Sequence, residues 1–141
     1  MTGIKIDGKL IAQTVKDRIK KTTDELKTDG INPCLATVLI GNNTASATYV
    51  RNKHKACEEV GIITKDHKLD ESVSQQELNK IIDELNADTS VHGILVQLPL
   101  PKHLSEFATT SRISPIKDVD GLTPHNSGLL SMKKAALVAC T

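Results

Sequence analysis

One lysine stands among apolar side chains in the stretch SATYVRNKHKACEEVGI, residues 46–62. At 100° per residue, the spacing of an α-helix, the apolar side chains gather on one side: Val50, Ala56, Cys57 and Val60. The charged side chains gather on the other side: Arg51, Lys55, Glu58 and Glu59. Lys53 falls in the middle of the apolar arc. Its stem either lies along that face with the amine at the edge, or the amine is withdrawn from water. A withdrawn amine is more readily neutral, and a neutral amine can accept a proton.

Two polar side chains precede Lys53 on the same helical face. Tyr49 lies one turn earlier, and Ser46 lies about one turn before Tyr49. Taken singly, Tyr49 is compatible with core packing, and Ser46 with a place in the first helical turn. Together with Lys53 they form a polar track along an otherwise apolar face, and this pattern is suited to holding and acting on a bound molecule.

Two further segments carry polar side chains of interest. Gln97 interrupts the apolar run GILVQLPLP (93–101), and a buried amide needs hydrogen-bond partners. It therefore either bonds nearby loop backbone or orients a lysine or a ligand. Asp118 and Asp120 stand two apart, ahead of Gly121, in KDVDG. This motif is compatible with a simple turn or with a ligand-binding carboxylate, and it lacks the spacing of a calcium loop.

The elements that must position these residues follow from the hydrophobic pattern. Strands are predicted for the apolar runs at 34–41, 62–69 and 91–100. Helices are predicted for 8–28, for 46–61, from Ser74 onward, and for 104–111. Asp7 is expected to cap the first helix and Gly30 to end it, with Ile11, Val15, Ile19 and Leu26 on one face. Ser74 and Glu77 form a capping box for a helix that carries Leu78, Ile81, Ile82 and Leu85.

Strands that alternate with helices at this spacing predict an α/β layered domain, with a mainly parallel sheet flanked by helices. Ligands in such open sheets bind beyond the carboxyl ends of the strands. Three of the polar features fall there: the turn that leads into the Lys53 helix, Gln97 at the end of the third strand, and the KDVDG loop.

Composition restricts the function classes. The chain has 141 residues, of which 38% are hydrophobic and 25% charged, and this predicts one globular domain. A formal net charge of +1, without a block of like charges, argues against a nucleic-acid or membrane partner. Tyr49 and Phe107 are the two aromatic residues, so Tyr49 is the main surface on which a flat ligand could stack.

Motifs that are missing from the sequence narrow the chemistry further. Cys34, Cys57 and Cys140 form no CxxC pair, which argues against a disulfide framework and favours the reducing cytoplasm. The five histidines lack paired metal-ligand spacing, so no metal is expected. The sequence contains no glycine-rich phosphate or dinucleotide motif, so we expect this chain to bind no dinucleotide by itself.

Three blocks of the sequence resemble successive blocks of one enzyme family: VLIGNNTASATYVRNKHKACEEVGI, GILVQLPLPKHL and SPIKDVDGLTPHNSG. The family is the bifunctional methylenetetrahydrofolate dehydrogenase and methenyltetrahydrofolate cyclohydrolase. The resemblance implies an N-terminal α/β catalytic domain followed by a Rossmann domain, with the folate in the cleft between them. It thus identifies residues 1–141 as a folate-binding catalytic domain that stops before the NAD(P)-binding domain.

The resemblance also implies roles for individual residues. Lys53 matches the catalytic lysine, Tyr49 the tyrosine that packs over the folate and bonds the lysine, and Gln97 the glutamine bonded to that lysine. Asp120, next to Gly121, matches the aspartate that binds the pterin. Ser46 matches a nearby serine of the same helix that belongs to the substrate site.

The implied chemistry has two steps. Hydride passes from 5,10-methylenetetrahydrofolate to NADP or NAD, and water then converts 5,10-methenyltetrahydrofolate to 10-formyltetrahydrofolate. The resemblance implies a cytoplasmic homodimer that acts on tetrahydrofolate derivatives, supports purine biosynthesis, uses NADP bound by the following domain, and needs no metal.

The sequence departs from the family pattern in three places: Thr44 stands where a proline is usual, the segment SEFATTSR is atypical, and LVACT replaces a family PCT segment. Two alternative functions remain open. One is a non-catalytic folate-binding or interaction module that lacks the cofactor domain, and the other is an α/β scaffold without folate chemistry. The combination of Lys53, Tyr49, Gln97 and Asp120 favours the enzyme.

Overall fold

The computed structural model describes residues 6–138, so Cys140 and the LVACT departure at Ala139 lie outside the described part. Eight elements follow one another along the chain: α1 (Gly8–Thr28), β1 (Cys34–Ile40), α2 (Thr44–Glu59), β2 (Ile63–Leu69), α3 (Gln75–Ala87), β3 (Gly93–Val96), α4 (Glu106–Arg112) and α5 (Pro124–Ser131). The strands and the first four helices confirm the predicted order of elements.

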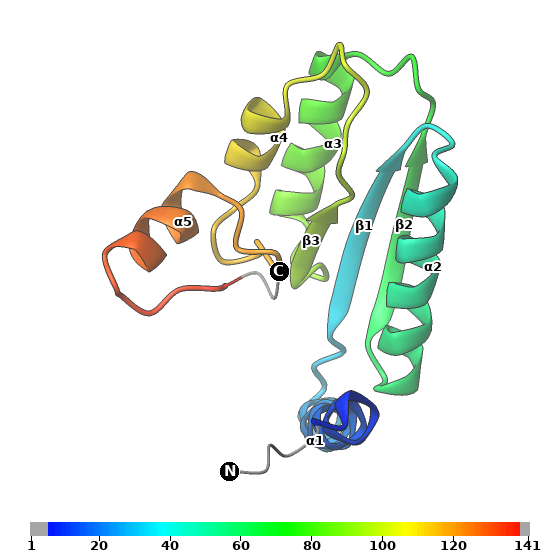
Figure 1. Ribbon diagram of the computed structural model, residues 1–141, viewed down its shortest axis with the longest axis vertical. Helices are drawn as coiled ribbons and strands as arrows, with labels where there is room; N and C mark the ends of the chain where they lie inside the picture. The colour runs from blue at the N-terminus through cyan, green and yellow to red at the C-terminus, as the bar shows by residue number, and fades with distance from the viewer. Residues whose placement is uncertain (1–5, 139–141) are drawn as a thin grey trace.

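The three strands form one parallel sheet in the order β2-β1-β3. All of β1 pairs with β2, from Cys34↔Ile63 to Ile40↔Leu69, whereas β3 pairs with the shorter stretch from Leu35↔Gly93 to Val38↔Val96. Figure 1 shows α2 and α3 on opposite sides of this sheet. The α/β layered fold expected from the sequence is therefore the observed one.

The alternation of side chains along β1 separates the core from the other face of the sheet. Its even-numbered residues belong to the hydrophobic core, together with side chains from α3, β3 and the segments around α4: Cys34, Ala36, Val38, Ile40, Leu78, Ile82, Leu85, Val91, Ile94, Val96, Leu104 and Ile113. The intervening residues of β1 point to the face on which α2 packs. That face carries the candidate site.

Capping interactions fix where α2 and α3 begin and where α2 ends. Asn43 caps α2 by accepting a hydrogen bond from Ser46 N, at 3.0 Å. At the other end, Gly61 adopts φ 79°, and its N–H and that of Ile62 bond back to Glu58 O and Cys57 O. This Schellman pattern ends the helix where the next strand must begin. The predicted capping box at α3 is present in full.

Three predictions about the elements need correction. The third strand is shorter than 91–100, because Gln97 turns its amide onto Leu98 O and Pro99 has no N–H to offer a neighbour. The fourth helix begins at Glu106, two residues later than predicted, because Ser105 is its cap. Helix α5 was missed: its apolar residues have no helical periodicity, although Thr123 followed by Pro124 is a helix-start signal.

The apolar face of α1 is largely exposed to solvent. Asp7 caps the helix as expected, but Ile11, Val15 and Ile19 are 54%, 39% and 37% exposed. α1 meets the rest of the domain through the Lys16–Glu59 ion pair. Nearer its C-terminal end, the buried Thr23 hydroxyl bonds Val60 O. In Figure 1, α1 is seen end-on beyond the start of β1. None of the helices within residues 6–138 combines the length and the apolar character needed to span a bilayer.

We expect Ile82→Ala to lower the free energy of unfolding by about 2–5 kcal/mol, because this fully buried side chain of α3 fills the core beneath the sheet. Gln76→Ala, at an exposed position of the same helix, is the control and should change stability by less than about 0.5 kcal/mol. Urea unfolding followed by circular dichroism measures both. Equal effects of the two variants would mean that α3 does not close the core.

Candidate functional site

Lys53 and Gln97, which come from different elements, meet on the α2 face of the sheet. The Lys53 Nζ donates to Gln97 Oε1 at 3.4 Å. The Gln97 amide is held in this orientation because its Nε2 donates to Leu98 O at 2.7 Å, which leaves the oxygen for the lysine. The Gln97 backbone N–H bonds Val38 O at 2.9 Å, and this fixes the residue to the central strand. The sequence had left open whether Gln97 bonds loop backbone or a lysine, and it does both.

The polar track of α2 is present, with different exposure along it. Ser46 is buried, Lys53 is half-buried, and Tyr49 is 62% exposed. Lys53 is therefore less enclosed than its place in the apolar arc had suggested. Among the described residues, no hydrogen bond joins Tyr49 to Lys53, so the tyrosine ring and hydroxyl stay available to a ligand.

The KDVDG loop is fixed to the domain by its first residue. Lys117 Nζ donates to three carbonyl oxygens at the end of α3: Leu85 O at 3.1 Å, Asn86 O at 2.8 Å and Asp88 O at 2.8 Å. These are carbonyls that a helix end leaves without intrahelical partners, and a cation there is favourable. Lys117 O also accepts from Ile94 N at 2.7 Å, which aligns the loop with β3.

Asp118 is the internal anchor of this loop. It is 2% exposed and accepts hydrogen bonds from Asn126 Nδ2 at 2.8 Å, from Thr123 N at 2.8 Å and from Leu122 N at 3.2 Å. Burial by itself raises the pKa of a carboxyl, but these hydrogen bonds outweigh it and hold the pKa of Asp118 below its usual value. Asp118 is therefore a charged structural residue.

Asp120 differs from Asp118 although the two are separated by one residue. It is half-buried, and its carboxylate has no hydrogen-bond partner among residues 6–138. Gly121 turns the chain after it with φ 67°, a conformation that favours glycine. Val119 lies over the floor of the sheet: its Cγ1 would be 2.5 Å from a Cβ added to Gly93. Gly93 therefore allows the loop to approach β3 closely, and Asp120 is left free to accept hydrogen bonds.

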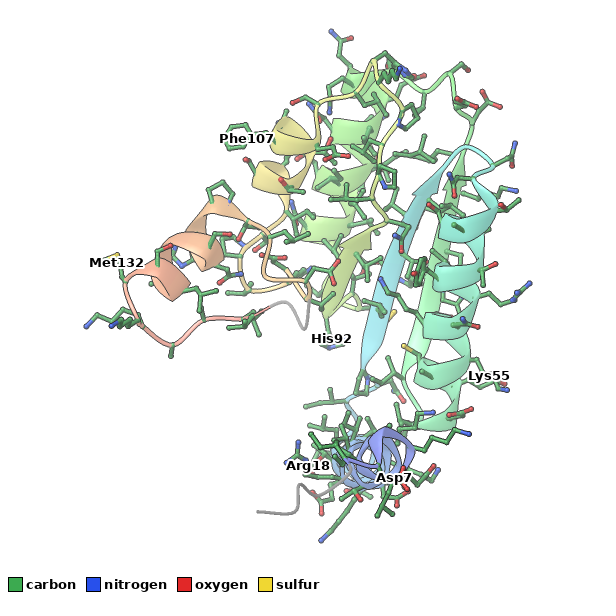
Figure 2. The ribbon with its side chains drawn as sticks, in the orientation of Figure 1. Asp7, Arg18, Lys55, His92, Phe107 and Met132 are labelled. Atoms are coloured by element: carbon green, nitrogen blue, oxygen red, sulfur yellow. The ribbon has the colours of Figure 1, made fainter. Side chains whose placement is uncertain are left out.

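An apolar hollow of about 270 Å³ lies between α2 and this loop. Its lining comes from the beginnings of the strands, from α2 and from the loop: Pro33, Cys34, Leu35, Cys57, Ile62, His92, Gly93 and Val119. Cys57 is one turn beyond Lys53, and His92 lies at the start of β3 (Figure 2). Burial raises the pKa of the Cys34 and Cys57 thiols, so both are uncharged in this hollow. A flat, uncharged ring would fit such a lining.

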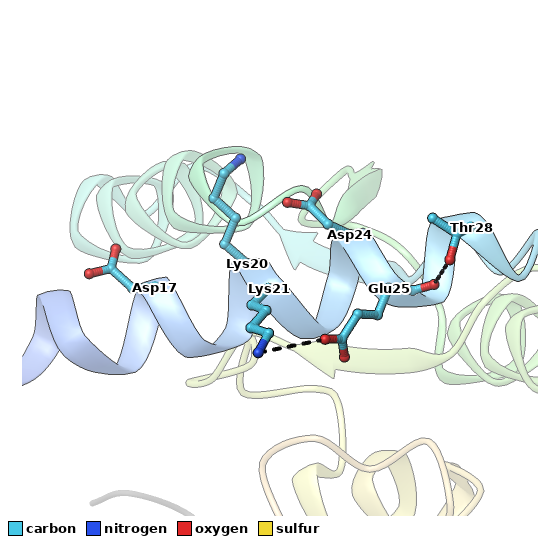
Figure 3. Close-up of a pocket in the computed structure, with 6 residues that line it drawn as sticks. All are labelled: Asp17, Lys20, Lys21, Asp24, Glu25 and Thr28. Atoms are coloured by element: carbon cyan, nitrogen blue, oxygen red, sulfur yellow. Dashed lines mark hydrogen bonds and ion pairs between the residues drawn. The ribbon is translucent and has the colours of Figure 1, made fainter.

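A second hollow, of about 520 Å³, lies on the surface of α1 and has a different character (Figure 3). It is lined by one helix alone: Asp17, Lys20, Lys21, Asp24, Glu25 and Thr28. Charges of both signs alternate there, and Lys21 Nζ lies 4.0 Å from Glu25 Oε1. Groups on one exposed helix face cannot converge on a ligand, so this hollow is not a candidate site.

Two sets of residues in this region were missed from the sequence. Lys117, Asn126 and Thr123 hold the loop, and Thr37, His54 and Asp66 form a polar cluster between α2 and the sheet. The parallel register that places Thr37 opposite Asp66 depends on pairing, which spacing along the chain does not reveal. No group of three or more potential metal ligands occurs in the described part of the chain.

A family model and the curated relatives point to the same family. The family model described as "Tetrahydrofolate dehydrogenase/cyclohydrolase, catalytic domain" matches residues 6–120. The "Bifunctional protein FolD" of Nitrosopumilus maritimus (strain SCM1) is 77% identical over 141 residues, which are 100% of this chain and 49% of that protein. The chain therefore spans about half the length of the curated relatives it matches.

Solved structures show the same fold. The bifunctional FolD dehydrogenase/cyclohydrolase from Campylobacter jejuni superimposes with a TM-score of 0.93 at 45% identity, over 95% of this chain and 48% of that one. The Trypanosoma brucei dehydrogenase-cyclohydrolase, solved with NADP and an inhibitor, gives 0.90 at 33% identity, over 98% of this chain and 48% of that one.

The lowered pKa of Asp118 predicts how stability depends on pH. Because the folded state holds this proton less tightly than the unfolded state, the stabilisation is present above the ordinary carboxyl value of 3.8 and is lost as pH falls through the lower folded pKa. We expect Asp118→Asn to lose about 1.5–3 kcal/mol of stability at pH 7, with the difference from wild type shrinking below about pH 4.

Asp120→Asn is the matched control for Asp118→Asn, because its carboxylate has no partner in the described structure and the wild-type dependence on pH should remain. Denaturant unfolding between pH 2.5 and 7 measures both variants. An Asp118→Asn protein with wild-type stability at neutral pH would contradict the anchoring role.

Proposed function

The chain belongs to the tetrahydrofolate dehydrogenase/cyclohydrolase family, and from that premise we propose that it supplies the folate site and the catalytic lysine of an enzyme of one-carbon metabolism. The complete protein would oxidise 5,10-methylenetetrahydrofolate to 5,10-methenyltetrahydrofolate with NAD(P) and hydrolyse the product to 10-formyltetrahydrofolate. The single observation that carries the proposal is the Lys53–Gln97 pair, an oriented amine on an otherwise apolar face.

Lys53 is proposed as the group that moves the proton in the hydrolytic step. Methenyltetrahydrofolate is a cation, so a neutral amine is better suited than an ammonium to lie beside it. The amine would accept a proton from the water that attacks the one-carbon bridge. It would return this proton to the ring nitrogen as the carbon–nitrogen bond breaks and the ring opens. The second proton of the water would leave to solvent as the oxygen becomes the formyl carbonyl. The hydrogen-bonded Gln97 oxygen would hold the amine in place during both transfers.

The other candidate residues are proposed to bind the folate. The exposed Tyr49 ring offers a stacking surface one turn from Lys53, and the unpartnered Asp120 carboxylate can accept two hydrogen bonds from an amino-substituted pterin edge. Gly121 would allow the ring to approach the backbone. Ser46 is proposed to line the site at the beginning of α2, although its burial favours a supporting role there.

The hydride acceptor is proposed to be NADP, held by the further half that the relatives possess. A related Trypanosoma brucei enzyme was solved with NADP. Residues 6–138 contain no glycine-rich phosphate loop, so the proposed cofactor contacts belong to that further half. We also propose that the complete protein is a homodimer of the cytoplasm whose 10-formyl product supports purine biosynthesis, and that residues 1–141 form its folate-binding domain.

A folate-binding module without catalysis is the second candidate. Tyr49 and Asp120 would be needed by either protein, but binding alone does not call for an oriented amine. The Lys53–Gln97 hydrogen bond therefore favours the enzyme. Variants of Lys53 and Asp120 separate the alternatives, because the first should affect turnover and the second should affect binding.

We expect Lys53→Met to lower kcat of methenyltetrahydrofolate hydrolysis by about 10²–10⁴-fold in the complete protein, the usual contribution of a general acid–base group. Folate affinity should change little, because methionine keeps most of the apolar stem. Stopped-flow loss of methenyl absorbance gives the turnover. Lys55→Met, on the exposed side of α2, is the control. A Lys53→Met protein with normal hydrolytic turnover would end the catalytic assignment.

For Asp120→Asn we expect weaker folate binding with unchanged stability. Loss of a charge-assisted bond of about 1.5–3 kcal/mol would raise KM of both reactions by roughly 10–150-fold, with similar kcat values. Steady-state kinetics and thermal unfolding, measured together, test this. If Asp120→Asn instead lowered the melting temperature and left KM unchanged, its role would be structural.

A further inference from the structure

Three polar side chains from three elements meet between α2 and the sheet. One of them, His54, follows Lys53 in the sequence. His54 Nε2 lies 2.8 Å from Asp66 Oδ1 of β2 and 3.0 Å from Thr37 Oγ1 of β1. Thr37 Oγ1 donates to the same Asp66 oxygen at 2.8 Å. Thr37 and Asp66 are direct partners in the parallel register, so the cluster joins α2 to both strands.

The hydrogen positions in this cluster follow from the number of donors. The Thr37 hydroxyl has one hydrogen, and Asp66 Oδ1 accepts it. A lone pair on His54 Nε2 would then face the Asp66 oxygen at 2.8 Å, which would be repulsive. Nε2 therefore carries a hydrogen and donates it to Asp66. Thr37 is 1% exposed, so its bond to Asp66 also satisfies a buried hydroxyl.

His54 and Lys53 are neighbours on α2 but contact different parts of the domain. Adjacent helical residues point about 100° apart. His54 reaches β1 and β2, whereas Lys53 reaches Gln97 beyond the end of β3. A rotation of α2 about its axis by about 10° would move an atom about 6 Å from that axis by about 1 Å. The existing Lys53–Gln97 bond, at 3.4 Å, would not survive such a shift in the unfavourable direction.

We propose that His54 is a positioning residue, which fixes the rotation of α2 through Asp66 and Thr37 and thereby holds the Lys53 amine against Gln97. This inference rests on the proposed function of Lys53. It assigns His54 no contact with substrate. The helix has other anchors, since Val50 and Val60 are buried and both ends are capped, so the role of His54 is to set orientation and is not required for folding.

Three variants test the proposal in the complete protein. His54→Leu keeps a side chain of similar bulk and removes the hydrogen bond, whereas His54→Gln restores a donor near the position of Nε2. Lys55→Leu is the matched control, because Lys55 extends away from the sheet (Figure 2). Each is measured for kcat and KM of methenyltetrahydrofolate hydrolysis and for melting temperature.

We expect His54→Leu to lower kcat by about 10–100-fold, the range that a misplacement of about 1 Å can cause. KM should change less than kcat, because Asp120 and Gly121, which are proposed to bind the pterin, do not lie on α2. His54→Gln should recover to within about three-fold of wild type, and Lys55→Leu should match wild type. A lower melting temperature with normal kcat in His54→Leu would overturn the proposal and leave His54 a structural residue.

A second measurement separates this inference from the proposed function. In the ¹H–¹⁵N spectrum, the side-chain amide signals of Gln97 should shift in His54→Leu and stay in place in His54→Gln and Lys55→Leu. If wild-type protein neither binds folate nor hydrolyses it, the proposed function fails, and the Gln97 signals still decide whether His54 positions Lys53. Unchanged Gln97 signals in His54→Leu would refute the positioning role.

If His54→Leu does not fold, a variant of its partner replaces it. Asp66→Ala removes the acceptor at a half-exposed position and must give the same kinetic and spectral changes.

Discussion

The two-residue alternation of the central strand β1 is the constraint on which the rest of the structure depends. Its even-numbered side chains enter the core against α3, so its odd-numbered side chains must face α2. A polar residue such as Thr37 can therefore stand in a central strand without entering the core, because α2 brings a partner to it. The same alternation places Gly93 and Gln97 on the α2 face, where the candidate site lies.

Three sets of polar interactions support the site and lie beside it. Lys117 holds the loop to the end of α3, Asp118 holds the loop internally, and His54 holds α2 to two strands. In contrast, Lys53 has one long hydrogen bond, and the Asp120 carboxylate has none among residues 6–138. Groups that are fixed by their surroundings but keep free hydrogen-bonding capacity can bind a ligand without first breaking internal bonds.

The features that could be predicted from the sequence depend on local signals. Asp7 and Gly30 mark the ends of α1, and Ser74 with Glu77 marks the start of α3, because caps are formed within a few residues of the chain. The strand order and the exposure of α1 depend on which elements meet. Periodicity places Ile11, Val15 and Ile19 on one face, but it does not reveal that this face is exposed.

In the candidate site too, local features could be predicted from the sequence, whereas contacts between distant elements could not. The positions of Lys53 and Gln97 were recognisable because each is a polar residue in an apolar pattern. Asp118 and Asp120 could not be separated by spacing, since their difference comes from Asn126 and the backbone of Thr123. The partners of His54 were hidden for a similar reason: Thr37 and Asp66 are 29 residues apart and meet only through the parallel register.

The central claim is that folate binds on the α2 face of the sheet, between Tyr49, Lys53, Gln97 and Asp120. Mapping the backbone and side-chain amide shifts of this chain while a non-reactive tetrahydrofolate analogue is added tests it most directly. The account predicts that the largest shifts occur at those four residues and at Gly121. Chemical-shift changes centred on the exposed face of α1 would contradict it. Saturable binding that leaves the chemical shifts of Lys53 and Gln97 unchanged would contradict it as well.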